Sequence, residues 1–138
     1  MTSLRDVKLY TLKTIVEPDG NLVALESNRD IPFLIKRIFY VYGVHNQNDR
    51  GEHSHYKTKQ VLVPINGSVD ILCDDGNERV TYHLNKKNQA LYIPELIWDR
   101  ITFNDRNSVL LSIANTKYNP NDYIEDYNKF KRLKNENK

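Results

Sequence analysis

The chain has 138 residues and a formal net charge of +2, with 28% charged and 39% hydrophobic residues. This length fits one domain with one core, so we expect residues 1–138 to form a single unit. So small a charge argues against a nucleic-acid partner, and a lone cysteine excludes an internal disulfide. Because the apolar runs are too short to cross a membrane and no secretion signal is present, we expect a cytoplasmic protein.

Short segments rich in β-branched and aromatic residues follow one another along the chain, and each ends at a turn signal. Asn66-Gly67, a dipeptide that favours the positive φ of tight hairpins, separates two of them. The predicted strands span residues 7–15, 22–26, 33–44, 60–65, 68–73, 79–84, 90–93, 100–103 and 108–114. This pattern predicts an all-β fold, either an antiparallel sandwich or a small barrel.

The last segment differs from the rest. After Asn119-Pro120, the stretch NDYIEDYNKF carries Tyr123, Tyr127 and Phe130 at positions i, i+4 and i+7, with acidic residues in the first turn. This spacing predicts one amphipathic helix packed against an edge of the barrel. We interpret its aromatic side chains as packing residues without a chemical role.

Two of the four histidines stand one residue apart in the run RGEHSHYKTKQ, residues 50–60. Side chains at i and i+2 on a strand share a face, so His53 and His55 would present two imidazoles to one bound object. That object is either a metal ion or a substrate. A polar loop that happens to contain two histidines is the third interpretation.

The spacing around the pair resembles the first cupin motif, in which a glycine precedes H-x-H and a glutamate and a second glycine follow. Gln60 (or Lys59 on the shorter spacing) stands where a metal-binding cupin has glutamate, and Gly67 closes the pattern. Two neutral imidazoles and an amide make a weak site for a divalent metal. We therefore expect an organic substrate and no bound metal.

The second cupin motif, P-x-G-x-x-H, is approached by PELIWD, in which Asp99 takes the place of the last ligand. His53, His55 and Asp99 could together form a triad of two histidines and one carboxylate. We expect Arg100 to compete for that carboxylate, which disfavours the triad.

Four collinear stretches carry a more specific resemblance: DGNLVALESNRDIPFLIKRIFYVYGV (19–44), RGEHSHYKTKQVLVPINGSVDILCDDGN (50–77), LYIPELIWDRI (91–101) and YNPNDYIEDYNKFKR (118–132). Together they cover most of the chain, which resembles the dTDP-4-oxo-6-deoxyglucose 3,4-ketoisomerases. The resemblance implies a small cupin-type, jelly-roll-like barrel that works without a metal or other cofactor. It also implies a homodimer that exchanges an N-terminal strand, and movement of a keto group from C4′ to C3′ of a dTDP-linked 6-deoxy-hexose.

Such an isomerisation needs a base that removes the acidic C3′ proton and an acid that delivers a proton to C4′. An imidazole has an ordinary pKa of about 6.5 and can act in either direction, so we assign His53 and His55 as this pair. Tyr40 is a candidate donor to the enediolate oxygen, or else a barrel filler.

The substrate's diphosphate needs cations, for which Arg37, Arg50 and Lys57 are the candidates. Strict alternation places Arg37 and Tyr40 on opposite faces of their strand, so both reach the site only if a bulge or a partner subunit intervenes. Gln60 would hydrogen-bond a sugar hydroxyl. Trp98 would pack on the sugar or thymine, or else belong to the core.

Three positions depart from the family pattern. Asp19-Gly20 stands where an R-G pair is common, Tyr56 where a lysine follows H-x-H, and Trp98-Asp99-Arg100 where the family has W-H-E. The configuration of the product at C4′ therefore stays open. The alternative functions are a nucleotide-sugar 3,5-epimerase, a metal-dependent cupin oxygenase and a non-catalytic cupin that binds a sugar nucleotide.

Overall fold

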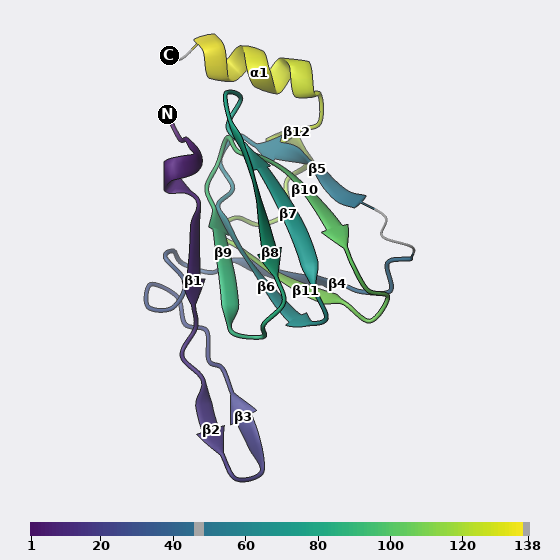
Figure 1. Ribbon diagram of the computed structural model, residues 1–138. Helices are drawn as coiled ribbons and strands as arrows, with labels where there is room; N and C mark the ends of the chain where they lie inside the picture. Colours follow the sequence, from purple (N-terminus) through teal and green to yellow (C-terminus); the bar gives the residue numbers. More distant parts are fainter. Residues whose placement is uncertain (46–48, 137–138) are drawn as a thin grey trace.

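The computed structural model describes residues 1–45 and 49–136. Its body consists of two five-stranded antiparallel sheets packed face to face (Figure 1). The first sheet has the order β1 (Lys8–Thr11), β9 (Gln89–Ile93), β6 (Gln60–Asn66), β11 (Val109–Ala114) and β4 (Arg37–Val41). The second has the order β12 (Tyr123–Ile124), β5 (Asp49–His55), β10 (Trp98–Phe103), β7 (Val69–Asp74) and β8 (Arg79–Leu84). The all-β prediction is thus confirmed.

The main core lies between the two sheets, where the inward positions of each strand alternate with outward ones. On β10, Asp99, Ile101 and Phe103 are buried, whereas Arg100 is exposed. The inward aliphatic side chains of β6, β7 and β9 complete this cluster. Along β10 the inward side chains change from the apolar Phe103 and Ile101 to the polar Asp99, and the cavity described below lies at this polar end.

A second apolar cluster covers the outer face of the first sheet. Residues 23–36 cross this face, and Ile31 and Phe33 pack against Val61 and Ile113. The strand predicted over 33–44 is therefore wrong in its first part, because β4 begins only at Arg37. Phe33 and Ile35 have the residue types of a strand, but their side chains serve this outer cluster rather than a ladder.

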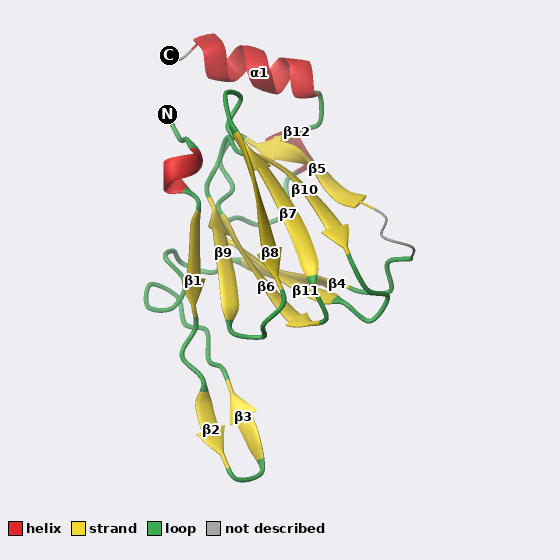
Figure 2. Ribbon diagram, in the orientation of Figure 1, coloured by secondary structure: helices red, strands yellow, loops and turns green. Residues whose placement is uncertain are grey.

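The single strand predicted over 7–15 is two strands. β1 adds to the edge of the first sheet, and β2 (Ile15–Glu17) pairs with β3 (Gly20–Leu22) in a hairpin. This hairpin projects well away from the sheets (Figures 1 and 2). Ile15, Val16 and Leu22 are all exposed on it, Val16 by 77%.

The predicted C-terminal helix is present, but it begins later than expected. α1 spans Tyr127–Glu136, and the side chain of Asp126 caps it by accepting hydrogen bonds from the backbone N–H groups of Asn128 and Lys129. Tyr123 lies instead in β12, after the short 3₁₀ turn Pro120–Asp122.

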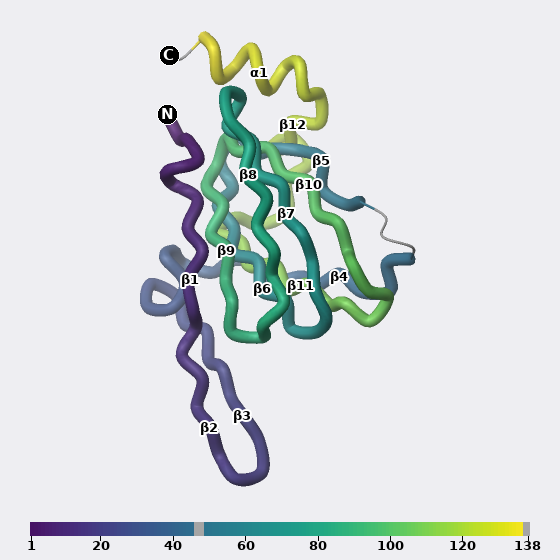
Figure 3. Tube along the Cα trace, in the orientation of Figure 1, coloured from purple at the N-terminus to yellow at the C-terminus, as the bar shows by residue number. Residues whose placement is uncertain are grey.

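α1 lies across one end of the sheets, and the chain's N-terminal residues reach the same end (Figure 3). The buried Lys134 joins the two, since its Nζ donates to the backbone oxygens of Thr2, at 2.5 Å, and Leu96, at 2.8 Å. A second 3₁₀ turn, Leu4–Asp6, leads from the N-terminus into β1. Among the described residues, no helix has the length and apolar character that crossing a bilayer requires.

Candidate active site

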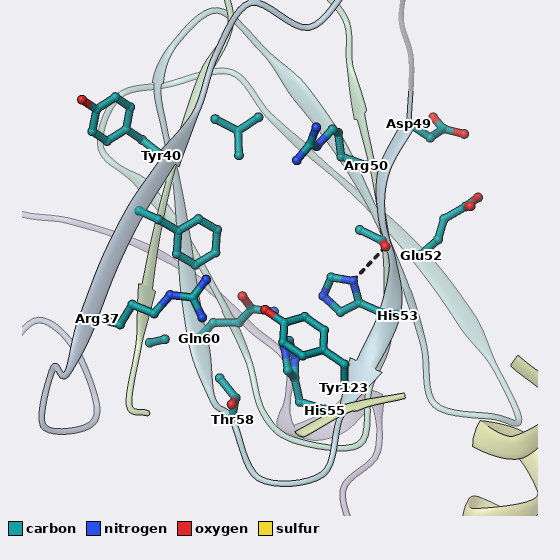
Figure 4. Close-up of a pocket in the computed structure, with 14 residues that line it drawn as sticks. Arg37, Tyr40, Asp49, Arg50, Glu52, His53, His55, Thr58, Gln60 and Tyr123 are labelled. Carbon is teal, nitrogen blue, oxygen red and sulfur yellow. Dashed lines mark hydrogen bonds between the residues drawn. The ribbon is translucent and has the colours of Figure 1, made fainter. Parts of the chain in front are cut away.

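A cavity of about 680 Å³ opens between β4 of the first sheet and β5 of the second (Figure 4). Its wall includes both histidines of the H-x-H run and several predicted ligand-binding residues, namely Arg37, Arg50, His53, His55 and Gln60. Two further residues line it: Tyr123, which the sequence interpretation assigned to helix packing, and Thr58, which it did not consider. The cavity therefore gathers most of the polar residues that the sequence marked.

His53 and His55 lie on the same face of β5, as their spacing predicts. Their ring centroids are 4.9 Å apart and the rings meet edge to face. The Nδ1 atom of His53 lies 2.8 Å from the backbone oxygen of Gly51 (Figure 4). Because a carbonyl oxygen can only accept, Nδ1 carries a proton, so in the neutral imidazole Nε2 is the atom that can accept one.

A β-bulge in β5 brings Arg50 onto the same face as the histidines. Asp99 pairs with His53 and Arg100 pairs with Gly51, so Glu52 is the extra residue, with a φ of 48°. Without the bulge, Arg50 and His53 would lie on opposite faces, because they are three residues apart. Arg50 instead pairs with the inward-facing Ile101 and points into the cavity (Figure 4).

Burial of His55 controls its charge. Its side chain is 7% exposed, and this desolvation lowers its pKa to about 4. The positive charges of His53 and Arg37 act in the same direction, whereas Asp122 opposes them. His55 is therefore a neutral imidazole at neutral pH, able to accept a proton.

Asp99 lies on the neighbouring strand β10, directly opposite His53 in the β5–β10 ladder. Burial raises the pKa of its carboxyl to about 6, and the charge of His53 reduces that rise. Gln60 Nε2 donates to Asp99 Oδ2 over 3.4 Å. The expectation that Arg100 competes for this carboxylate is wrong, because Arg100 is on the outer face and pairs with Asp49 at 3.7 Å.

Tyr123 is a cavity residue that the sequence interpretation assigned to helix packing. It lies opposite His55 in the β12–β5 ladder, and its ring centroid is 5.0 Å from that of His53 and 4.6 Å from that of His55. One available signal was Asp126, since an aspartate just before Tyr127 is a natural N-cap and would start the helix after Tyr123.

Arg37 points into the cavity from β4 together with Phe39. Its guanidinium carbon lies 4.4 Å from the ring centroid of Phe39 and 5.0 Å from that of Tyr118. Flanking by two aromatic rings restricts the guanidinium plane, which favours a defined contact with an anionic group.

Three predicted site residues are not brought to the imidazoles. Tyr40 borders the rim, but it is 62% exposed, stacks on Tyr42 and turns its hydroxyl away from the histidines (Figure 4). Lys57 is exposed and is tied down through its backbone N–H, which donates to Asp122. Trp98 packs on Tyr127 and Phe130 of α1 rather than in the cavity.

Three or more His, Cys, Asp or Glu side chains placed to share one metal ion are not found in residues 1–45 and 49–136. The triad of His53, His55 and Asp99 considered above is therefore not assembled in this geometry. The polar groups of the cavity are arranged around an open volume instead.

Comparison with known proteins identifies the family to which the chain is similar. The family model described as "FdtA: WxcM-like, C-terminal" matches residues 5–135. A TDP-4-oxo-6-deoxy-α-D-glucose-3,4-oxoisomerase of Aneurinibacillus thermoaerophilus is 36% identical over 125 residues, which are 91% of this chain and 90% of that protein.

Solved structures extend the comparison to the fold. The sugar 3,4-ketoisomerase QdtA of Thermoanaerobacterium thermosaccharolyticum, in complex with TDP, superposes with a TM-score of 0.93 at 36% identity and covers 98% of each chain. The TDP-fucose-3,4-ketoisomerase WlaRA of Campylobacter jejuni gives 0.90 at 35% identity, over 95% of this chain and 97% of that one. A dTDP-4-dehydrorhamnose 3,5-epimerase of Bacillus anthracis, at 12% identity, shares the cupin-like fold with a TM-score of 0.76, over 89% of this chain and 79% of that one. The chain therefore belongs to the FdtA/WxcM-like family of sugar-nucleotide 3,4-ketoisomerases and is an isomerase.

Proposed function

We propose that this chain converts a dTDP-linked 4-keto-6-deoxy-hexose into its 3-keto isomer by proton transfer between His53, His55 and the sugar. The observation that carries the proposal is the pair of imidazoles on one face of β5, within a cavity of about 680 Å³. Membership of a 3,4-ketoisomerase family supports the same reaction.

The chemistry balances within the substrate. The 4-ketone acidifies the C3′ hydrogen, one imidazole removes this proton, and an enediol forms between C3′ and C4′. The other histidine, as an imidazolium, donates a proton to C4′, and the proton of the C3′ hydroxyl is transferred to the C4′ oxygen. The keto group thus ends at C3′, a proton passes between the two imidazoles to restore them, and no external oxidant or reductant is consumed. The neutral imidazole of His53 can accept a proton at Nε2, and the lowered pKa of His55 keeps that imidazole unprotonated at neutral pH.

The hydroxyl that stabilises the enediolate belongs to Tyr123 in this proposal. In Figure 4 the Tyr123 hydroxyl points into the cavity, whereas the Tyr40 hydroxyl points away from it. The Tyr123 ring also lies against both imidazoles. A donor fixed beside the bases can meet the oxygen on which negative charge develops.

The diphosphate binds to Arg37 and Arg50, which reach the cavity from opposite sheets. The rings of Phe39 and Tyr118 hold the Arg37 guanidinium, and the bulge directs Arg50 inward. Gln60 hydrogen-bonds a sugar hydroxyl where a metal-binding cupin would carry a glutamate. A relative crystallised with TDP supports a nucleotide in this role.

The active form in this proposal is a homodimer in which N-terminal segments are exchanged. The β2–β3 hairpin supports this arrangement, because it projects from the body and exposes Ile15, Val16 and Leu22 (Figure 1). An exposed apolar hairpin of this kind is typical of a surface that a second copy covers. Light scattering of wild type and Val16→Lys tests the proposed dimer. We expect a dimeric wild type and a weakened dimer in Val16→Lys, and a monomeric wild type would refute the proposal.

The proposed pathway places a nucleotidyltransferase and a 4,6-dehydratase upstream. An aminotransferase that uses pyridoxal phosphate would capture the 3-keto product and lead to a 3-amino sugar of a surface glycan. This order follows from the chemistry, since an amine is installed at the carbon that carries the ketone.

The test is NMR of chelator-treated protein with dTDP-4-keto-6-deoxyglucose in D₂O. A 3-keto sugar with deuterium at C4′ is expected, and its configuration gives the galacto or gluco product. Exchange at C3′ and C5′ with the 4-ketone retained would indicate a 3,5-epimerase. Binding without exchange would indicate a non-catalytic module. His53→Asn and His55→Asn, compared separately, assign the two proton transfers.

A further inference from the structure

Asp99 has a carboxyl group that the proposed mechanism does not use. Its side chain is 2% exposed, and it lines a smaller cavity of about 100 Å³. This cavity shares Arg50, His53 and Gln60 with the large one, so Asp99 lies at the inner end of the same site. A carboxyl taken out of water needs partners that compensate the lost hydration.

The partners of Asp99 are few. Among the described residues, its carboxyl makes one side-chain hydrogen bond, the long one from Gln60, and no salt bridge to lysine or arginine. Burial therefore dominates, and the pKa of Asp99 is raised to about 6. The charge of His53 is what lowers it in opposition.

Gly51 connects Asp99 to His53. The backbone oxygen of Gly51 accepts the Nδ1 proton of His53 at 2.8 Å. Gly51 has a φ of +91°, and a Cβ built on it would lie 2.8 Å from Oδ1 of Asp99. The carboxyl thus lies close against the same residue whose oxygen fixes the imidazole, and Asp99 and His53 are paired in the ladder.

We propose that Asp99 is a positioning residue for His53. Its carboxyl lies against the bulged Gly51 whose backbone oxygen holds the imidazole, and so keeps His53 oriented toward the substrate. The consequence for catalysis rests on the proposed function. The coupling between Asp99 and His53 does not, and it can be measured in the free protein.

The titration of Asp99 and His53 depends on the charged and titratable groups that face them from the neighbouring strands. On the Asp99 side, β7 contributes the Cys73 thiol, whose pKa is raised chiefly by burial, and β6 contributes the neutral Gln60. On the His53 side, the facing groups are His55 and Arg50 from β5, Tyr123 from β12 and Arg37 from β4. Because His53 is the neighbour that lowers the pKa of Asp99, removing His53 should change the titration of this carboxyl in a predictable direction.

The first experiment follows the Asp99 carboxyl carbon by NMR during a pH titration of wild type and His53→Gln. The midpoint is expected near 6 in wild type and higher in His53→Gln, because a nearby cationic charge is lost. His83→Asn is the matched control, since His83 pairs with Asp70 away from the cavity. Equal midpoints in wild type and His53→Gln would overturn the proposal.

The second experiment compares the pH profile of kcat/KM for Asp99→Asn and wild type. We expect Asp99→Asn to lower kcat at pH 8 by about tenfold to a hundredfold, and to remove the change that wild type shows near pH 6. Binding of dTDP, measured by calorimetry, should stay the same, which separates positioning from a damaged fold. Superimposable profiles would overturn the catalytic role. If wild type itself shows no turnover, the proposed function fails while the NMR titration still decides the coupling.

Discussion

The ring of Tyr123 lies 4.6 Å from the ring of His55, centroid to centroid, because the two residues are opposite each other in the β12–β5 ladder. The C-terminal segment thus does more than support the helix that follows it. It closes one side of the cavity and places a phenol beside the proposed bases.

We expect Tyr123→Phe to lower kcat by about tenfold or more while leaving dTDP affinity near that of wild type, since the ring is kept and one donor is lost. Tyr40→Phe is the matched comparison, because Tyr40 and Tyr123 are the two candidate hydroxyl donors to the enediolate oxygen. Steady-state kinetics of both variants would measure it. A larger loss in Tyr40→Phe would assign the role to Tyr40, supplied across a subunit interface.

The sequence predicted the parts of the site that depend on local periodicity. The i, i+2 spacing placed His53 and His55 on one face, and Asn66-Gly67 predicted a turn with positive φ, which Gly67 has at +71°. The turn is not a hairpin, however, because β6 and β7 belong to different sheets and the chain crosses from one to the other there. Both predictions depend on a few adjacent residues. Such features need no knowledge of a partner strand.

Other features of the site depend on residues far away in the chain: Arg50 was predicted as a ligand-binding residue, but the bulge that turns it inward and the strand that carries Tyr123 were not. Arg50 faces inward only because of the bulge opposite Asp99 and Arg100, which strict alternation does not include. The i, i+4, i+7 pattern from Tyr123 fits a helix as well as it fits a strand followed by a helix. Pairing with β5 and the burial of Asp122, which accepts from the N–H groups of Lys57 and Thr58, decide for the strand.

We expect His55→Asn to make the protein less sensitive to acid. The pKa of His55 is about 4 in the folded chain and about 6.5 when unfolded, so between these pH values the unfolded state binds the extra proton. Wild type therefore loses stability from this residue as pH falls, by up to about 3 kcal/mol. Urea unfolding at pH 7 and pH 4 would measure it: the difference between variant and wild type should shift in favour of the variant at pH 4.

The stability of Asp99→Asn relative to wild type should change with pH in the opposite direction to that of His55→Asn. The pKa of Asp99 is about 6 in the folded chain and about 3.9 when unfolded, so its contribution to stability is present at low pH and is lost as pH rises through 6. The asparagine variant should gain up to about 3 kcal/mol relative to wild type between pH 4 and pH 8. Asp19→Asn, at the exposed β2–β3 turn, is the control. A gain that does not grow with pH would contradict the prediction.

Gly51 is required for two separable reasons, and Gly43 offers a matched comparison. Both have a positive φ, +91° for Gly51 and +70° for Gly43, so an alanine at either position costs about 1–2 kcal/mol of backbone strain. A Cβ at Gly43 meets nothing within 4 Å, whereas a Cβ at Gly51 lies 2.8 Å from the Asp99 carboxyl and 3.3 Å from the Asp99 backbone oxygen.

Gly51→Ala should therefore lower the free energy of unfolding more than Gly43→Ala does, and the excess reports the close approach to Asp99. Because His53 is fixed by the Gly51 oxygen, Gly51→Ala should also reduce kcat in the fraction that stays folded. Denaturant unfolding and kinetics of the two variants side by side would test this. Equal losses of stability would mean that the backbone conformation alone explains the glycine, and that the carboxyl can move aside.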